Sequence, residues 1–246
     1  QYHKVFEVKL GLKEVFSSTT IKAHANLIGN SEVKKHISIQ KVQDAEDYPV
    51  SAGQRRLWVL SQFTGSAGVY NMPFHLALKG AYDVKCFSKA IEATISRHEA
   101  LRTVFKINDE GEVRQVIKTT EELGFRVNYM DYTTDLHQDT NVAQYIKEDT
   151  YAAFDLTNGP LVRASILQLS DDDYIFYYNI HHIVCDGWSM NVLAKDVLAL
   201  YEQLLEEKEP ELPVLKIQYR DYAVWQQEQL QQEQNNVHKE YWLKTL

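Results

Sequence analysis

The sequence has little of several features that assign a protein to a class by themselves. Its two cysteines among 246 residues, Cys86 and Cys185, are too few and too far apart for a disulfide framework or a cysteine-based metal site. No apolar run approaches the roughly 18 residues that a membrane-spanning helix requires. The N-terminus shows neither the apolar core nor the cleavage site of a signal peptide. These absences favour a reducing, cytoplasmic compartment and argue against a membrane partner.

Positive charge is also in short supply. The chain holds 26 Lys and Arg against 34 Asp and Glu, a net charge of −8. A surface that binds nucleic acid needs clustered Lys and Arg to neutralise phosphates, so nucleic acid is not expected as a partner. Hydrophobic residues at 44% and charged residues at 24% are typical of a soluble globular protein.

Composition also divides the chain. Residues 1–29 end in a helix whose N-cap is Thr19 or Thr20, and one short helix cannot close a core. We therefore expect these residues to be the end of a larger domain. The polar, aperiodic stretch 30–47 is typical of a linker.

Residues 48–209 alternate between two apolar periodicities. Helical spacing is found in residues 51–63, 83–101 and 142–153 and again from Ser189 onward. Strand-like patterns are found in residues 70–80, 102–117, 125–130, 161–169 and 174–180. Helices that alternate with strands predict an α/β layer architecture. One more helix is expected from residue 219, polar on most of its surface.

The stretch HHIVCDG places two adjacent histidines at the end of a strand-like run. Successive strand residues point to opposite faces, so one of His181 and His182 should pack inside while the other opens toward a cavity. Asp186 and Gly187 follow in a sharp turn before a helix. The plainer interpretation is that both histidines are core residues with satisfied hydrogen bonds and that Asp186 caps the helix.

Two other chemistries find little support in the residues. Adjacent histidines cannot easily bind one tetrahedral zinc ion, and no Cys-x-x-Cys or His-x-x-x-His completes a ligand set. No serine lies in the Gly-x-Ser-x-Gly turn of the α/β hydrolases. From the residues alone, the histidine pair leaves both catalysis and packing open.

Three further stretches, together with HHIVCDG, resemble one family. Residues 181–187 resemble the HHxxxDG motif of the chloramphenicol acetyltransferase-like acyltransferases. Residues 51–60 (SAGQRRLWVL), 97–105 (RHEALRTVF) and 219–226 (YRDYAVWQ) resemble, in the right order, motifs of the condensation domains of nonribosomal peptide synthetases. Gly53 departs from the alanine that is usual in the first of these.

The resemblance implies a fold and a domain order. It implies a chloramphenicol acetyltransferase-like lobe with a central mixed sheet flanked by helices, and a second lobe that is largely absent. Residues 48–209 would form the N-terminal lobe, and 210–246 the inter-lobe segment and the first helix of the C-terminal lobe. Residues 1–29 resemble the C-terminal end of a peptidyl carrier domain, with 30–47 as linker.

The resemblance also implies how substrates arrive. Carrier domains hold phosphopantetheine on a serine in a Gly-Gly-x-Ser motif, and none of Ser17, Ser18 and Ser31 lies in that context. We therefore expect no prosthetic arm, bound cofactor or metal on this chain. The implied partners are the upstream and downstream peptidyl carrier domains and the adenylation domain of the same synthetase.

The implied reaction is amide formation, in which the amine of one carrier-bound aminoacyl thioester attacks the thioester carbonyl of another. Imidazole titrates near neutrality, so His182 is expected to act as general base or to position the amine. His181 is expected mainly to support backbone and packing. Gly187 would allow a close backbone approach or a positive φ. Its N–H would face the developing oxyanion, unless Gly187 is a simple turn glycine.

The resemblance assigns supporting roles as well. Asp186 would form a buried ion pair with Arg102, and Arg97 of the same motif would help to support the site. The fragment alone is expected to be inactive. HHIVCDGWS resembles condensation domains more than epimerization domains, and a donor of L configuration is expected. Two alternatives stay open: a stand-alone CoA-dependent acyltransferase, against which the carrier-like tail argues, and an inactive module that docks carrier domains.

Overall fold

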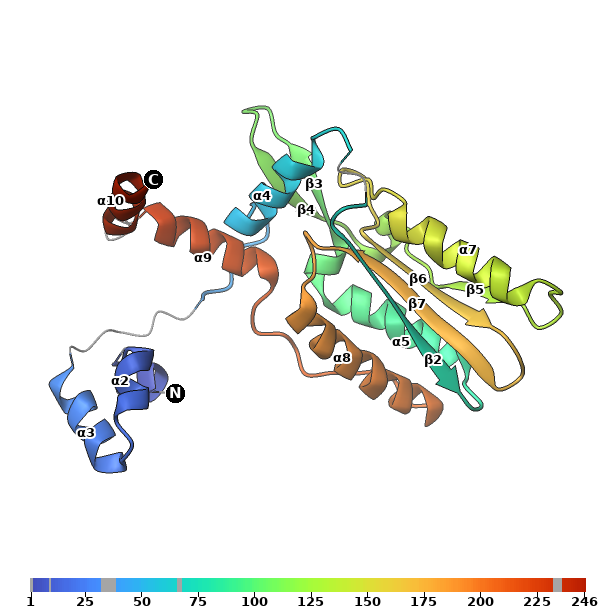
Figure 1. Ribbon diagram of the computed structural model, residues 1–246, viewed down its shortest axis with the longest axis horizontal. Coiled ribbons are helices and arrows are strands. Elements are labelled where there is room, and N and C mark those ends of the chain that lie inside the picture. The colour runs from blue at the N-terminus through green and yellow to red at the C-terminus, as the bar shows by residue number, and fades with distance from the viewer. Residues whose placement is uncertain (1, 9, 32–38, 66–67, 232–235) are drawn as a thin grey trace. The chain divides into compact units, whose positions relative to one another are not determined.

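The computed structural model describes residues 2–8, 10–31, 39–65, 68–231 and 236–246 and divides into two compact units, 1–40 and 41–246 (Figure 1). The unit 1–40 contains helices α1 (Tyr2–Phe6), α2 (Leu12–Ser17) and α3 (Ile21–Asn30). The expected N-cap is confirmed, because the side chain of Thr20 accepts a hydrogen bond from the backbone N–H of Ala23. Neither α2 nor α3 has a buried residue, and Ile21 is 90% exposed.

The unit 41–246 is built on two sheets. The larger sheet has the strand order β2-β7-β6-β5, in which β5 and β6 are parallel and the other neighbours antiparallel. Its strands are β2 (Asn71–Lys79), β5 (Asn128–Asp131), β6 (Val162–Gln168) and β7 (Asp173–His181). The smaller sheet has the order β1-β4-β3, and its strands are β1 (Tyr48–Pro49), β3 (Thr103–Ile107) and β4 (Val113–Ile117).

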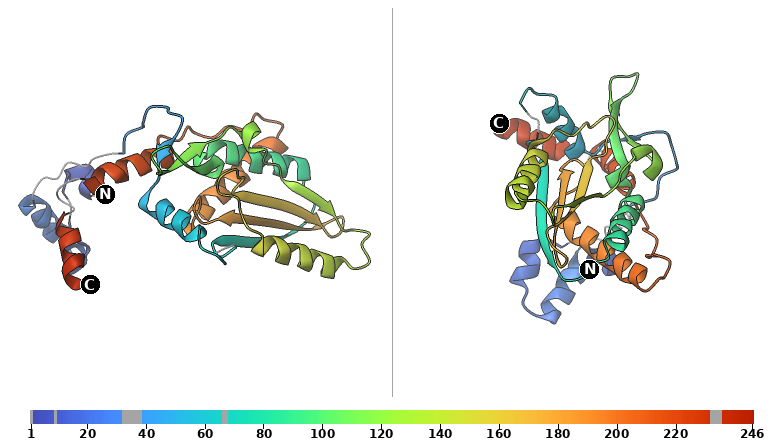
Figure 2. Two further views of the ribbon diagram at one scale, coloured as in Figure 1. Left: turned by 90° about the horizontal axis from the view of Figure 1, so that it is seen from above. Right: turned by 90° about the vertical axis from the view of Figure 1, so that its right-hand side faces the viewer.

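Helices cover both faces of the larger sheet. Helices α5 and α8 pack against each other on one face, and α7 lies on the other (Figure 1, Figure 2). The helices of this unit are α4 (Ala52–Ser61), α5 (Val84–Arg97), α6 (Thr120–Leu123), α7 (Gln138–Tyr151), α8 (Gly187–Leu205), α9 (Tyr219–Gln231) and α10 (Asn236–Thr245), with a 3₁₀ helix η1 (Glu99–Arg102). The predicted mixed sheet flanked by helices is therefore confirmed. In the part of the chain that the structure describes, no helix combines the length and apolarity needed to cross a bilayer.

Local sequence signals explain most of these elements. Helix α5 begins where Asp83 accepts a hydrogen bond from the backbone N–H of Cys86, and its stripe of Phe87, Ile91 and Ile95 is buried. The β3–β4 hairpin turns at Gly111, whose φ of +80° favours glycine. These predicted elements are confirmed, and they place the core between the sheet and α5 and α8.

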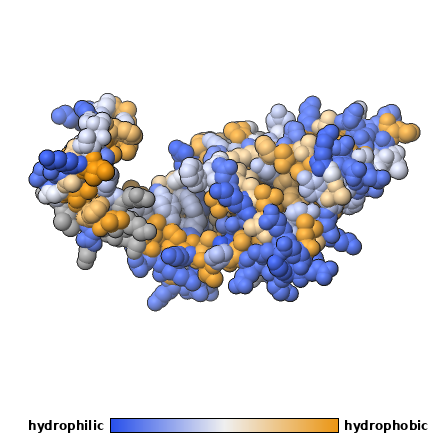
Figure 3. Space-filling model, turned by 90° about the horizontal axis from the view of Figure 1, so that it is seen from below, coloured by the Kyte–Doolittle hydropathy of each residue, from blue (hydrophilic) through white to orange (hydrophobic). Residues whose placement is uncertain are grey.

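Some apolar side chains of this unit stay at the surface. Phe74 and Leu76 are 51% and 49% exposed, because β2 is an edge strand of the larger sheet. Figure 3 shows apolar side chains between polar ones on one face of the unit. Such mixtures are normal for folded proteins.

Residues 41–48, which we call the strap, are bound to α9 by hydrogen bonds and an ion pair. The backbone N–H of Val42 donates to Asp221 at 2.9 Å, and Arg220 pairs with Asp44 at 2.7 Å. Arg220 also donates to the hydroxyl of Tyr48 at 2.5 Å. The expected linker 30–47 thus lies partly outside the described residues, at 32–38, and partly in this strap.

Candidate functional site

Strand β7 brings the histidine pair to the end of the larger sheet. His181 is opposite Asn71 of β2, and its backbone N–H donates to the oxygen of Leu161 at 3.0 Å. The N–H of His182 donates to the oxygen of Tyr70 at 2.9 Å. The two side chains differ as a strand end requires: His181 is buried and His182 is exposed.

His181 is held as a neutral imidazole. Its Nδ1 accepts a hydrogen bond from the backbone N–H of Ile183 at 3.1 Å, so Nδ1 carries no proton. Burial, with a smaller contribution from the charge of His182, lowers the pKa of His181 to about 4. The ring of Phe154 meets the imidazole edge-on at 6.0 Å, and that of Tyr70 lies at 6.3 Å. These contacts suit packing and support of the turn.

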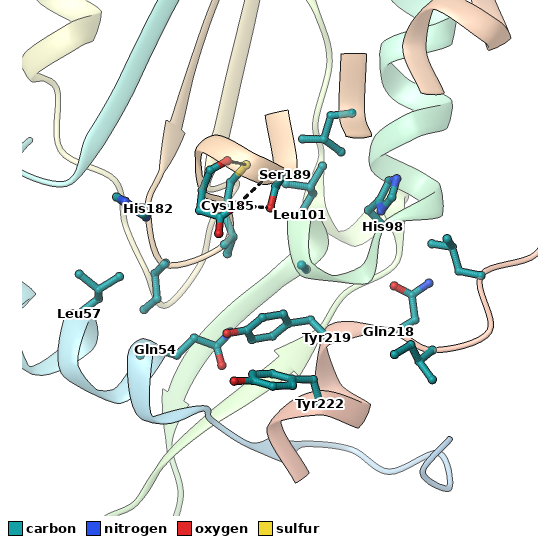
Figure 4. A pocket seen from close by; sticks show the side chains of 18 of the residues that line it. Gln54, Leu57, His98, Leu101, His182, Cys185, Ser189, Gln218, Tyr219 and Tyr222 are labelled. Atoms are coloured by element: carbon teal, nitrogen blue, oxygen red, sulfur yellow. Dashed lines mark hydrogen bonds between the residues drawn. The ribbon is translucent and has the colours of Figure 1, made fainter. Parts of the chain in front are cut away.

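His182 has a different environment. Its side chain lines a cavity of about 530 Å³, and no hydrogen bond between described residues holds its ring. Figure 4 shows His182 at one side of this cavity and Tyr219 and Tyr222 of α9 at another. An exposed imidazole that borders a cavity can reach a bound amine, which the buried His181 cannot.

Asp186 caps helix α8. Its Oδ1 accepts hydrogen bonds from the backbone N–H of Ser189 at 2.8 Å and from the Ser189 hydroxyl at 2.6 Å. The pKa of Asp186 is lowered first by the Ser189 hydroxyl and then by the Ser189 backbone N–H. The capping interpretation is therefore confirmed.

The expected ion pair between Asp186 and Arg102 is wrong for this structure. The guanidinium of Arg102 donates to the backbone oxygens of Ser96, at 3.0 Å, and of Lys118, and no ion pair among the described residues joins it to Asp186. Arg102 is thus occupied by carbonyls at the ends of α5 and β4, while the carboxylate of Asp186 is occupied by the backbone N–H and the hydroxyl of Ser189 at the start of α8.

Arg97 connects α5 to α8 and to the loop that follows α8. Its Nε donates to Asp196 of α8 at 3.0 Å, and its Nη2 donates to the oxygen of Pro213 at 2.7 Å. His98 bonds the same oxygen of Asp196 at 2.8 Å, and His98 also lines the cavity. This cluster joins the end of α5 to the middle of α8.

Gly187 is the first residue of α8. The expected positive φ is wrong, because Gly187 is not among the left-handed glycines. A methyl group added at Gly187 would meet no atom of the described residues within 4 Å, so the space beside this glycine is open. The structure shows Gly187 as a helix start.

The cavity also includes residues that the sequence did not indicate. Gln54 of α4, Gln218 and Tyr219 line it, although none of them was assigned a role in the site from the sequence. Tyr219 lies at the first position of α9, and its hydroxyl is 2.9 Å from the Ser51 Oγ. The only sequence signal that could have identified Tyr219 is the YRDYAVWQ motif. Its helical periodicity predicts a helix but not which face of that helix borders a cavity.

Cys185 lies in the wall of the same cavity. It is buried, and burial raises the pKa of its thiol to about 11. Its Sγ lies 3.4 Å from the Sδ of Met190, in keeping with a small buried filler. Within the described residues, no three His, Cys, Asp or Glu side chains gather as metal ligands would.

Comparison with known proteins gives a consistent result. A family profile described as "Condensation domain" matches residues 44–246. The chain is 36% identical over 245 residues to gramicidin S synthase 2 of Aneurinibacillus migulanus, covering 100% of the chain and 5% of that protein. It is also 35% identical over 240 residues to bacitracin synthase 3 of Bacillus licheniformis, covering 98% of the chain and 4% of that protein.

Solved structures agree on the fold. The X-domain from teicoplanin biosynthesis matches with a TM-score of 0.73 and 26% identity, covering 84% of this chain and 44% of that one. The starter condensation domain of rhizomide synthetase RzmA matches with a TM-score of 0.72 and 24% identity, covering 82% and 48%. The chain thus spans 5% or less of these two curated relatives and under half of these two solved chains.

Proposed function

The chain belongs to the condensation-domain family, as its motifs predicted, and we propose that it takes part in peptide-bond formation between carrier-bound thioesters. The curated relatives are synthases of gramicidin S and bacitracin, so the products here would be nonribosomal peptides. The substrates would arrive on the phosphopantetheine arms of upstream and downstream carrier domains, loaded by an adenylation domain of the same synthetase. We expect this to happen in the cytoplasm.

One observation carries the proposal: the second histidine of the motif, and not the first, borders the cavity. An amine that attacks a thioester must lose a proton, and an accessible imidazole can accept it or hold the amine in place. The carbonyl carbon then bonds to nitrogen, and the thiol of the donor arm leaves. His181 keeps the turn in shape through its bond with the Ile183 N–H.

The supporting residues fit the proposal without the expected ion pair. Asp186 fixes the start of α8, and Arg97 holds α8 to the end of α5 through Asp196. The N–H of Gly187, at the helix start, would be available to a developing oxyanion. We propose that all three act on the position of His182 or of the substrate carbonyl.

The test is an amide-formation assay with the complete polypeptide that contains this sequence and with loaded upstream and downstream carriers. Dipeptidyl-carrier product should form with the parent and fall by orders of magnitude in His182→Ala at an unchanged melting temperature. Equal product from both proteins would contradict the role of His182. Turnover of free CoA thioesters would favour a stand-alone acyltransferase, and carrier affinity without product a docking module.

A further inference from the structure

Tyr219 and His182 line the same cavity although they come from different motifs. The ring of Tyr219 faces the cavity from the first turn of α9, near Gln54 (Figure 4). The residue is 37% exposed, so its ring is only partly covered by protein. A partly exposed aromatic residue contributes less to the core than a buried one.

Both sequence neighbours of Tyr219 are nevertheless firmly anchored. Gln218 donates through Nε2 to the backbone oxygen of Arg97 at 3.0 Å. Arg220 is buried and pairs with Glu99 at 3.2 Å. Anchors on either side fix the backbone at Tyr219, and the side chain of Ser51 contacts its hydroxyl. Functional side chains need this kind of support from the residues around them.

The hydroxyl of Tyr219 belongs to a short chain of hydrogen bonds. The Ser51 Oγ accepts from the backbone N–H of Gln54 at 3.1 Å, and it lies 2.9 Å from the Tyr219 hydroxyl. A serine hydroxyl has one proton to donate. When Ser51 donates that proton to the oxygen of Tyr219, the proton of Tyr219 is left to point into the cavity.

We propose that Tyr219 donates a hydrogen bond to a carbonyl oxygen of the carrier-bound substrate in the cavity that His182 borders. This inference rests on the proposed function for its choice of substrate. Much of the remaining wall is aliphatic, with Leu57, Leu193 and Ile217 among its residues, and a few polar groups on such a wall orient a ligand. Burial raises the pKa of Tyr219, so the hydroxyl keeps its proton at neutral pH.

The test measures binding and not turnover. The probe is leucyl-pantetheine in which nitrogen replaces the thioester sulfur, so that the carbonyl remains but cannot react. Its Kd is measured by calorimetry on the complete polypeptide, as parent and as Tyr219→Phe. Loss of one hydrogen bond should raise the Kd about fivefold while the melting temperature is unchanged.

Tyr145→Phe is the matched control. The hydroxyl of Tyr145 also meets a serine, Ser165, at 2.6 Å, but neither residue lines the cavity. This control should bind the probe as the parent does. A Tyr219→Phe protein that binds within twofold of the parent would overturn the proposal, and so would a parent that does not bind the probe.

Ser51→Ala tests the chain of hydrogen bonds. Combined with Tyr219→Phe, it should weaken binding no further than Tyr219→Phe alone, because both changes remove one donor. If the losses of binding free energy were fully additive, they would contradict this chain of hydrogen bonds. His182→Ala separates the two proposals: if it forms amide at the parent rate while Tyr219→Phe still weakens probe binding, the proposed role of His182 fails and the role of Tyr219 stands.

Discussion

The Nδ1 atom of His181 accepts a hydrogen bond from the backbone N–H of Ile183, which lies two residues further along the chain. The bond needs a neutral imidazole, and burial favours the same form by lowering the pKa of His181 to about 4. The turn that carries His182 is therefore held together by a group that must stay uncharged.

We expect stability to fall as this group is forced to bind a proton. The pKa of His181 is lower in the folded chain than the ordinary value near 6.5, so its contribution is present above about pH 6.5 and is lost as the pH falls toward 4. Between about pH 7 and pH 5 this contribution should decrease by about 2 kcal/mol. Urea denaturation of the parent and of His181→Gln at both pH values measures it. An equal pH dependence in the two proteins would contradict the assignment.

Asp186→Ala should cost about 1 kcal/mol of unfolding free energy, which is the usual value of an N-cap. A buried ion pair with Arg102 would instead cost about 3–5 kcal/mol on loss of one partner. Asp186→Asn should retain most of the stability, because asparagine also caps helices. Urea denaturation of Asp186→Ala, Arg102→Ala and the double variant should give additive losses of unfolding free energy. A coupling free energy above about 1 kcal/mol would instead support the ion pair.

Arg220→Ala should be far more damaging. It removes the ion pair of Glu99, whose side chain is 17% exposed, at a cost of about 3 kcal/mol. Burial already raises the pKa of Glu99, an effect that the charge of Arg220 opposes. Arg114→Ala is the control, because its pair with Asp47 at 2.8 Å is more exposed and should be worth less than about 1 kcal/mol. If Arg220→Ala and Arg114→Ala lost equal unfolding free energy in urea denaturation, the proposed role of Arg220 in joining α9 to η1 would be contradicted.

Cys185 should resist alkylation in the folded protein. Burial raises the pKa of its thiol to about 11, so about a thousandth is ionised at about pH 8, and the thiolate is the reactive form. Cys86 is less buried and should be modified first. Mass spectrometry after timed exposure to iodoacetamide gives the order, and rapid labelling of Cys185 in native protein would mean that the cavity wall opens.

The elements that could be predicted from the sequence are those set by neighbours in the chain. Helix α5 follows from the cap at Asp83 and the stripe of Phe87, Ile91 and Ile95, and the β6–β7 pair from two apolar runs around an acidic turn. The opposite directions of His181 and His182 follow from strand geometry alone.

Contacts between distant residues could not be read in the same way. The pair of Asp186 with Arg102 came from resemblance, and here a local cap and two backbone oxygens satisfy the two residues separately. The place of Tyr219 in the cavity depends on Ser51, which lies 168 residues earlier. Periodicity identified α9 as a helix but not the surface that it faces.

The strap has a consequence for biosynthesis of the chain. The N–H of Val42 finds its acceptor in Asp221, 179 residues later. At about 5–20 residues per second, translation reaches Asp221 roughly 10–40 seconds after Val42 has been made. During that time the strap cannot form its hydrogen bond with α9. Its polar residues can be hydrated by water until α9 has been made. The strap is therefore among the last parts of this chain to form its contacts.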